Sequence, residues 1–172
     1  MPRTTLRVAA AALVVALVPA LAACSTGPNA STTTQQPSGN GSSASVGPLQ
    51  LRGVTIVKGD GDLGVGTIIG TIVNTGTDPD VLTGVTVAAP TGATATIVGT
   101  GTAAGGQLEL GPRTSTQIGY KGTDQIDLTG FQTKPSAYAE VVFTFARAGT
   151  VSVPVLAVPP SGIYAGIGPL AQ

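Results

Sequence analysis

The chain has 172 residues, with eight basic and eight acidic side chains, no histidine, no tryptophan and a single cysteine. An internal disulfide needs two cysteines, and the Ser-His-Asp and Cys-His arrangements of hydrolases need a histidine, so all of these are excluded. The basic residues form no cluster, which argues against a nucleic-acid partner.

The first 23 residues have the layout of an export signal. Arg3 and Arg7 give a positive start, and residues 8–21 form an apolar run that only Pro19 interrupts. The run is shorter than the ~20 apolar residues that a membrane-spanning helix needs. We therefore expect residues 1–23 to be a signal peptide. Without them, six basic and eight acidic side chains remain, and the net charge is near −2.

Small residues precede the single cysteine, in the order Leu21-Ala22-Ala23-Cys24. This stretch resembles the lipobox of bacterial lipoproteins, which implies transfer of diacylglycerol to the Cys24 sulfur and cleavage before Cys24. Two or three acyl chains, palmitate among them, hold a protein stably on a membrane. We expect Cys24 to be lipidated and the protein to lie on the outer face of the cytoplasmic membrane, in the cell envelope. The alternative is an ordinary secretory signal with a chance cysteine near its cleavage site.

Residues 24–46 are expected to be the lipid anchor and a disordered tether. Residues 25–46 are rich in Ser, Thr, Gln, Gly, Pro and Asn, with almost nothing to bury. Such a segment cannot offset the entropy of ordering its backbone, and its r.m.s. reach is roughly 25 Å.

From Leu49 onward, β-branched runs alternate with turns rich in Gly, Pro and Asp. No stretch has a convincing helical period, and short strands about every 10–12 residues predict an all-β antiparallel sandwich or barrel over residues 47–158. The expected strands are 49–57, 65–73, 81–88, 93–98, 107–110, 114–120, 126–128, 138–145 and 150–156.

Two of these strands allow finer predictions. In residues 138–145, one face would carry Ala139, Val141, Phe143 and Phe145, all apolar, so this face should point to the core. Pro154 lacks an amide donor, so the strand over residues 150–156 should lie at an edge or end at that position.

The last segment, residues 159–172, is rich in Gly and Pro but holds Ile163, Tyr164 and Leu170. We expect it to pack loosely across the sandwich; the alternative is a segment that binds a partner. Tyr138 and Tyr164 are candidates for an exposed contact surface, unless their rings pack against the sandwich.

Three stretches carry a family resemblance: Asn74-Thr75-Gly76, then residues 80–85 (DVLTGV), and later residues 143–151 (FTFARAGTV). Together they resemble the PCuAC family of periplasmic copper chaperones, and the order of lipobox, polar spacer, domain and short tail is similar to the LpqE-type lipoproteins. The resemblance covers roughly residues 49–158. It implies a Greek-key β-sandwich of the cupredoxin or immunoglobulin kind.

The family binds copper through two His and two or more Met, and thioether and imidazole suit Cu(I). Here the only methionine is Met1, within the signal, and there is no histidine. By the resemblance, one His-x-Met segment would fall near residues 125–127 (Gln-Ile-Asp) and the other ligands within residues 92–106. Neither stretch has a soft ligand, so we expect no copper site and no other cofactor.

Four carboxylates in two loops are weak candidates for Ca²⁺, which takes hard oxygen ligands. They are Asp60 and Asp62 in one loop and Asp78 and Asp80 in the other. Neither loop has EF-hand spacing, and Asp often forms turns through its own backbone. The turn-forming role is the favoured interpretation.

The sequence therefore predicts a non-enzymatic, lipid-anchored envelope protein whose sandwich acts as a binding or accessory module. It would bind the membrane through its lipid and present loops or a sheet edge to an envelope protein or an apolar ligand. The alternatives are a copper-chaperone-like lipoprotein with non-standard ligands and a purely structural envelope component.

Overall fold

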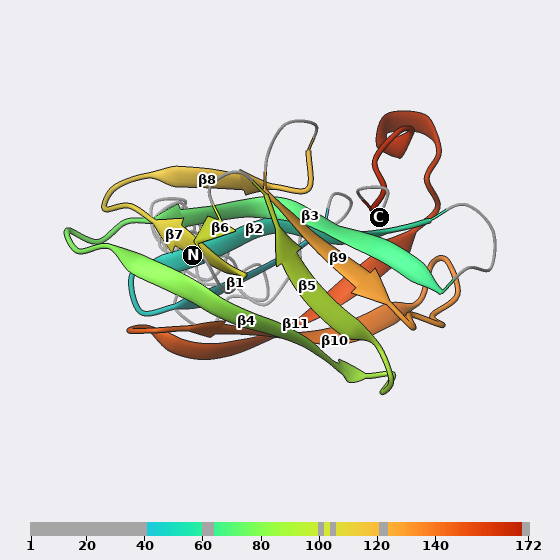
Figure 1. Ribbon diagram of the computed structural model, residues 1–172, viewed down its shortest axis with the longest axis horizontal. Helices are drawn as coiled ribbons and strands as arrows, with labels where there is room; N and C mark the ends of the chain where they lie inside the picture. The colour runs from blue at the N-terminus through green and yellow to red at the C-terminus, as the bar shows by residue number, and fades with distance from the viewer. Residues whose placement is uncertain (1–40, 60–63, 100–101, 104–105, 121–123, 170–172) are drawn as a thin grey trace, which may run out of the picture. The chain divides into compact units, whose positions relative to one another are not determined.

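A computed structural model describes residues 41–59, 64–99, 102–103, 106–120 and 124–169. In these segments the chain is almost entirely β-structure (Figure 1). The strands are β1 (Ser42–Val46), β2 (Leu49–Lys58), β3 (Val65–Asn74), β4 (Asp80–Ala89), β5 (Thr94–Val98), β6 (Thr102–Ala103), β7 (Gln107–Leu110), β8 (Ser115–Ile118), β9 (Gln125–Thr129), β10 (Tyr138–Phe145) and β11 (Gly149–Val158).

The strands follow the order β5-β9-β3-β2-β11-β10-β4-β7-β6, with β1 added to β2 and β8 added to β3. Neighbours in this order are often far apart in sequence, as in β2 beside β11 and β4 beside β10, which is the mark of Greek-key connections. Figure 1 shows β10 and β11 running beneath β2 and β3 as a second layer. The predicted Greek-key sandwich is confirmed.

One pairing between named strands departs from the predicted antiparallel arrangement. β11 pairs with β2 in parallel, over Leu156–Val158 and Thr55–Val57. The first half of the same edge of β2 is taken by β1, which is antiparallel to it. β11, which joins the two layers, therefore pairs with β2 only over its last residues, Leu156–Val158.

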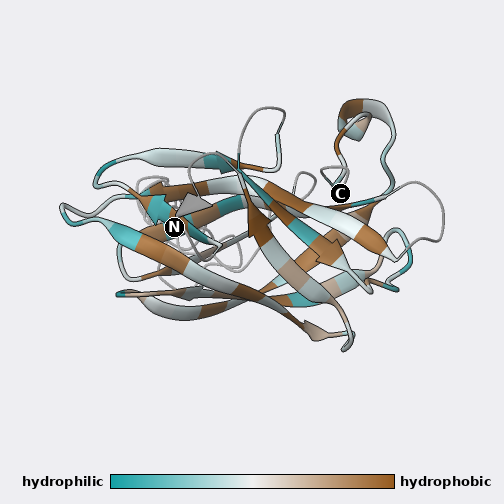
Figure 2. Cartoon of the chain, viewed as in Figure 1, coloured by the Kyte–Doolittle hydropathy of each residue, from teal (hydrophilic) through white to brown (hydrophobic). Residues whose placement is uncertain are grey.

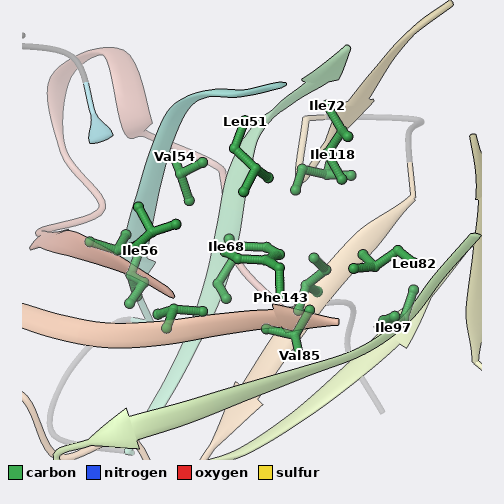
Figure 3. Close-up of a cluster of buried hydrophobic side chains, with 14 of the residues drawn as sticks. Leu51, Val54, Ile56, Ile68, Ile72, Leu82, Val85, Ile97, Ile118 and Phe143 are labelled. Atoms are coloured by element: carbon green, nitrogen blue, oxygen red, sulfur yellow. The ribbon is translucent and has the colours of Figure 1, made fainter. Parts of the chain in front are cut away.

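The core lies between the layers and consists mainly of aliphatic side chains (Figure 3). Hydrophobic positions recur along the strands (Figure 2). Burial alternates along β10 with the two-residue period of a half-buried strand, whereas much of β2, β3 and β9 is buried on both faces. In β10, Ala139, Val141, Phe143 and Phe145 are all at most 3% exposed. The predicted core face of this strand is confirmed.

Regular structure is present before the first predicted strand. Ser42–Val46 form β1, which pairs with β2, so a disordered tether through residue 46 is wrong for its last five residues. Ala44 and Val46 pack against the core cluster. Partial burial of these two apolar side chains and pairing with β2 stabilise β1, although the segment has the Ser-rich composition of a spacer.

Pro154 does not end β11, which continues to Val158. β11 is not an edge strand either, because it lies between β2 and β10, so the predicted edge or end is wrong. The side of β11 beside Pro154 is nevertheless open, because β11 pairs with β2 only from Leu156 onward. The Pro154 carbonyl accepts a hydrogen bond from the Ser42 hydroxyl. Since the N–H and C=O of one strand residue point the same way, the missing amide donor faces β1, where no ladder is interrupted.

After β11, residues 159–169 form an irregular segment with one short 3-10 helix, η2 (Gly162–Tyr164). Ile163 is 79% exposed and no residue of η2 is buried, which agrees with the expected loose packing. None of the helices in the described segments has the length and hydropathy to cross a membrane.

Candidate functional site

Two of the four candidate carboxylates lie where β3 is joined to β4: Asp78 is in the loop, and Asp80, the first residue of β4, is nearly buried at 5% exposure. One carboxylate oxygen accepts hydrogen bonds from the backbone N–H groups of Val81 (2.7 Å) and Arg147 (2.9 Å). The other accepts one from the N–H of Ala148 (2.9 Å). The carboxylate of Asp80 thus fastens the β10–β11 turn to the start of β4.

Asn74, 1% exposed, fixes the same loop from its other end. Its amide nitrogen donates to the carbonyls of Asp78 (2.9 Å) and Leu110 (3.2 Å). Its amide oxygen accepts a hydrogen bond from the N–H of Gly76 (2.9 Å). The N–H and hydroxyl of the next residue, Thr75, both donate to the Pro48 carbonyl, at 3.0 and 2.8 Å.

These hydrogen bonds explain why Asn, Thr, Gly and Asp occur at these positions. Each polar side chain here bonds to backbone groups of another loop or strand, which is a common role of short polar side chains in turns. Asn74, Thr75 and Asp80 therefore have a structural role in this loop.

A hollow of about 330 Å³ lies next to this turn, between residues 76–80, Pro48, Arg147 and Ala148. At its rim the Arg147 guanidinium lies 3.5 Å from an Asp78 carboxylate oxygen, with side chains 60% and 71% exposed. An ion pair this exposed contributes little to stability. The guanidinium also donates to the Pro79 carbonyl (3.2 Å).

Among the predicted calcium candidates, Asp80 accepts hydrogen bonds from three backbone N–H groups, and Asp78 forms an exposed ion pair with Arg147. Asp60, Asp62 and the lipidation residue Cys24 lie outside the described residues. In the segments that the structure does describe, no three His, Cys, Asp or Glu side chains are grouped as metal ligands would be.

The second candidate site is where the resemblance places the copper ligands. β5 and β9 form one antiparallel ladder in which Val98 lies opposite Gln125 and Thr96 opposite Asp127. Two segments almost thirty residues apart, which the family would use for binding, are therefore side by side.

The polar residues of β9 lie on the face of the strand opposite the core. Ile126 and Leu128 belong to the core cluster, so Gln125 and Asp127 point the other way. Both are nearly buried, at 7% and 5% exposure. The hydroxyl of Thr67, on β3, donates to a carboxylate oxygen of Asp127 (2.9 Å).

The Gln125 side-chain oxygen is buried and accepts no hydrogen bond, a feature it shares with the Thr133 hydroxyl among the described residues. A buried, unpartnered acceptor is costly and is usually satisfied by water or a bound group. This pair of β9 residues, with Thr67, can offer only oxygen ligands. Amide, carboxylate and hydroxyl oxygens suit hard cations, whereas Cu(I) prefers sulfur and imidazole.

The sequence did not indicate Thr67 or Asn74 as site residues. Thr67 is one of many threonines in β-branched runs, and only the β3–β9 pairing brings it opposite Asp127. Asn74 ends a strand, where asparagine is common in any turn, and its buried partners come from residue 110 as well as its own loop.

Comparison with known proteins gives matches at the level of structure alone. No protein-family model matches the sequence, and none of the curated proteins does. An apo PCuAC domain from PmoF1 matches with a TM-score of 0.60 and 20% identity, over 69% of this chain and 99% of that one. A copper-bound PCuAC domain from PmoF2 matches with a TM-score of 0.60 and 19% identity, over 69% and 98%.

A third solved structure, the apo PCuAC domain of PmoF2, has a TM-score of 0.57 and 19% identity, over 70% of this chain and 97% of that chain. All three match nearly whole PCuAC domains, and the predicted relationship is confirmed for the fold. The described sandwich has the fold of the PCuAC domains.

Proposed function

We propose that this protein is an exported lipoprotein, anchored by acyl chains on Cys24 to the outer face of the cytoplasmic membrane. Its PCuAC-like sandwich acts as a non-catalytic binding or accessory domain in which the copper site is lost. The arrangement of signal, lipid anchor, spacer and sandwich is similar to that of the LpqE-type lipoproteins.

The observation that carries the proposal is the composition of the β5–β9 ladder. The ladder brings together the two segments in which the resemblance places the copper ligands. The side chains on its outer face include Gln125, Asp127 and Thr96, and the whole chain has no histidine and no methionine beyond Met1. A PCuAC-like scaffold has been kept here, while the soft ligands that Cu(I) needs are missing.

Non-catalytic function is supported by the absence of histidine and by the hydrogen bonding of Asp80. With no histidine, general acid–base chemistry near neutral pH would depend on carboxylates, lysine or tyrosine. Asp80, the most buried carboxylate of the β3–β4 loop, already accepts three backbone hydrogen bonds.

The anchor is tested by fractionating cells that express the full chain or its Cys24→Ser variant. The proposal predicts that the wild-type protein sediments with membranes and that its mature form is heavier than residues 24–172 by the mass of a diacylglycerol. The variant should appear in the released fraction. A variant that still sediments with membranes, or a wild-type protein of unmodified mass, would contradict the anchor.

A metal-trafficking function with non-standard ligands is the second candidate, and one observation favours it. The unpartnered oxygen of Gln125 lies on the same face of β9 as the Asp127 carboxylate. If this function is correct, Gln125→Ala should weaken metal binding, while Thr86→Ala, at an exposed position of β4 outside the ladder, should leave it unchanged. Equal titration curves for wild type and both variants would exclude a site built on Gln125.

A further inference from the structure

Four connections between strands lie together at one end of the sandwich, at the left of Figure 1: β1–β2, β3–β4, β7–β8 and β10–β11. Hydrogen bonds join them. The Thr75 N–H donates to the Pro48 carbonyl (3.0 Å), and the Arg113 N–H donates to the Gly76 carbonyl (3.1 Å). The Asp80 carboxylate adds the β10–β11 turn to this group. Loops that a rigid scaffold fixes in this way are common places for binding residues.

The hollow of about 330 Å³ lies at this end, and three of the connections form its walls. The walls are rigid, because Pro48 and Pro79 have fixed rings and a Cβ added to Gly76 would lie 3.0 Å from the Pro48 Cβ. Its rim is open, since the side chains of Arg147 and Asp78 are 60% and 71% exposed. A free small molecule would stay largely in water there, whereas a side chain inserted by a larger partner would be covered by that partner.

Arg147 supplies hydrogen-bond donors to the hollow. A guanidinium has five N–H groups, and among the described residues the Pro79 carbonyl accepts a hydrogen bond from one of them (3.2 Å). The guanidinium is 3.5 Å from the Asp78 carboxylate, which is longer than the ~2.7–2.9 Å of a charge-assisted hydrogen bond. In the described part of the chain, most of these donors therefore have no protein acceptor. A guanidinium binds a carboxylate through two parallel N–H···O bonds.

The charges at this end favour an acidic partner. The exposed charged residues of the four connections are Arg113, Arg147 and Asp78, which are two cations and one anion. Asp80 lies beside them, but it is 5% exposed and its carboxylate already accepts three backbone hydrogen bonds. Arginine is enriched in protein interfaces, where it often carries much of the binding energy. Complementary charge also selects the partner and speeds its approach.

We propose that the hollow binds an Asp or Glu side chain from an acidic segment of an envelope protein, with the carboxylate on the Arg147 guanidinium. This inference rests on the proposed binding function, and it names the surface and the chemistry of the partner. Pro48 and Pro79 would contact the methylene groups of the inserted side chain. Asp78 has the same charge as the ligand and opposes it, so removal of that charge should strengthen binding.

The test uses the mature chain, residues 24–172, with Cys24 blocked, at about 0.15 M salt, where exposed charges more than about 8 Å apart are largely screened. The probe is a tetraglutamate peptide, acetylated and amidated so that its only charges are side-chain carboxylates. Tetraglutamine and inorganic phosphate are the comparison ligands. Binding is followed by the amide chemical shifts of Gly76 and Ala148, which line the hollow. The proposal predicts that tetraglutamate shifts these amides, that tetraglutamine does not, and that phosphate binds more weakly than tetraglutamate.

Three single substitutions separate the hollow from general attraction between charges. Arg147→Gln should lower the affinity for tetraglutamate about tenfold or more, because it removes the charge-assisted hydrogen bonds. Arg113→Gln removes the same charge from the neighbouring β7–β8 connection, outside the hollow, and should change the affinity less than about twofold. Asp78→Asn should raise the affinity about two- to fivefold. A purely structural Arg147–Asp78 pair gives no reason for this increase.

The absence of amide shifts with tetraglutamate, or equal shifts with tetraglutamine, would overturn the proposal. Equal losses of affinity in Arg147→Gln and Arg113→Gln would also overturn it, since they indicate a diffuse field. Phosphate binding as tight as that of tetraglutamate would do the same, because the site would then recognise an anion and not a protein segment.

Because this titration uses the unacylated chain, its failure would leave the anchor and the loss of the copper site standing. Failure of either of those would not alter the titration. The proposed function and this inference can thus fail separately.

Discussion

Asp80→Asn is the substitution that tests the structural role of the β3–β4 loop most sharply. The side chain keeps its shape but exchanges a carboxylate oxygen for an NH₂ group. In the wild type, two oxygens accept three backbone N–H groups, from Val81, Arg147 and Ala148. In either orientation of the amide, at least one of these N–H groups faces another donor in a site only 5% exposed.

Hydrogen bonds to a charged acceptor contribute about 1.5–3 kcal/mol each, and a buried donor left unpaired costs about 1–3 kcal/mol. We therefore expect Asp80→Asn to lower the free energy of unfolding by about 2–4 kcal/mol, measured by urea unfolding followed by circular dichroism. The matched control is Asp78→Asn in the same loop. Its carboxylate is 71% exposed and 3.5 Å from Arg147, so the change should stay within about 0.5 kcal/mol.

Equal stability of the two variants would refute the structural role of Asp80. Binding of Ca²⁺ by the Asp80 carboxylate would also refute it. If Ca²⁺ raised the unfolding midpoint of the wild type and not of Asp80→Asn, the carboxylate would be a metal ligand. We expect Ca²⁺ to leave both midpoints unchanged.

Three further changes test the packing. Phe143→Ala removes a fully buried ring and should cost about 3–5 kcal/mol in urea unfolding; a cost below about 1 kcal/mol would show that the core can collapse around it. Gly119 has a φ of 79°, and an added Cβ would lie 2.6 Å from a β3 carbonyl oxygen. Gly149 has a φ of 89°, but an added Cβ would meet nothing within 4 Å. Gly119→Ala should therefore lower the melting temperature more than Gly149→Ala. Equal shifts would contradict the close approach. Deleting residues 1–40 should leave stability unchanged, whereas deletion through Val46 removes β1 and should cost about 2–4 kcal/mol; equal stability of the two truncations would mean that β1 adds nothing.

Much of the strand pattern could be predicted from local sequence. β7 and β10 have the predicted bounds, and β2 to β4 differ by one residue at most at either end. These segments are bounded by Gly, Pro and Asp and are rich in β-branched residues, and in β10 the core face also repeats every second residue.

β1 and the parallel β2–β11 pairing could not be predicted in this way. The segment Ser42–Val46 has a spacer composition, and it becomes a strand because β2 offers an unpaired edge. The parallel pairing depends on where β1 ends along β2, which is a property of the assembled sheet. β6, with two residues, is too short for any periodicity.

For the candidate sites too, local sequence predicted some features, while others depend on how the strands pair. The resemblance pointed to residues 92–106 and 125–127, and the β5–β9 pairing places residues 94–98 beside residues 125–129. The burial of Gln125 and the partner of Asp127 come from strands that the local sequence does not connect. Asp80 was recognisable as a turn residue, but its bonds reach residues 67 and 68 positions away.

Titration with Cu(I) under reducing conditions, followed by native mass spectrometry, tests the central claim most directly. The claim is that a PCuAC-like sandwich has lost its copper site. The mature chain with a blocked Cys24 should show no copper adduct that survives competition from a Cu(I) chelator, because its ligands are oxygens. A stoichiometric adduct that resists the chelator and disappears in Gln125→Ala would contradict the claim and establish a metal-handling function.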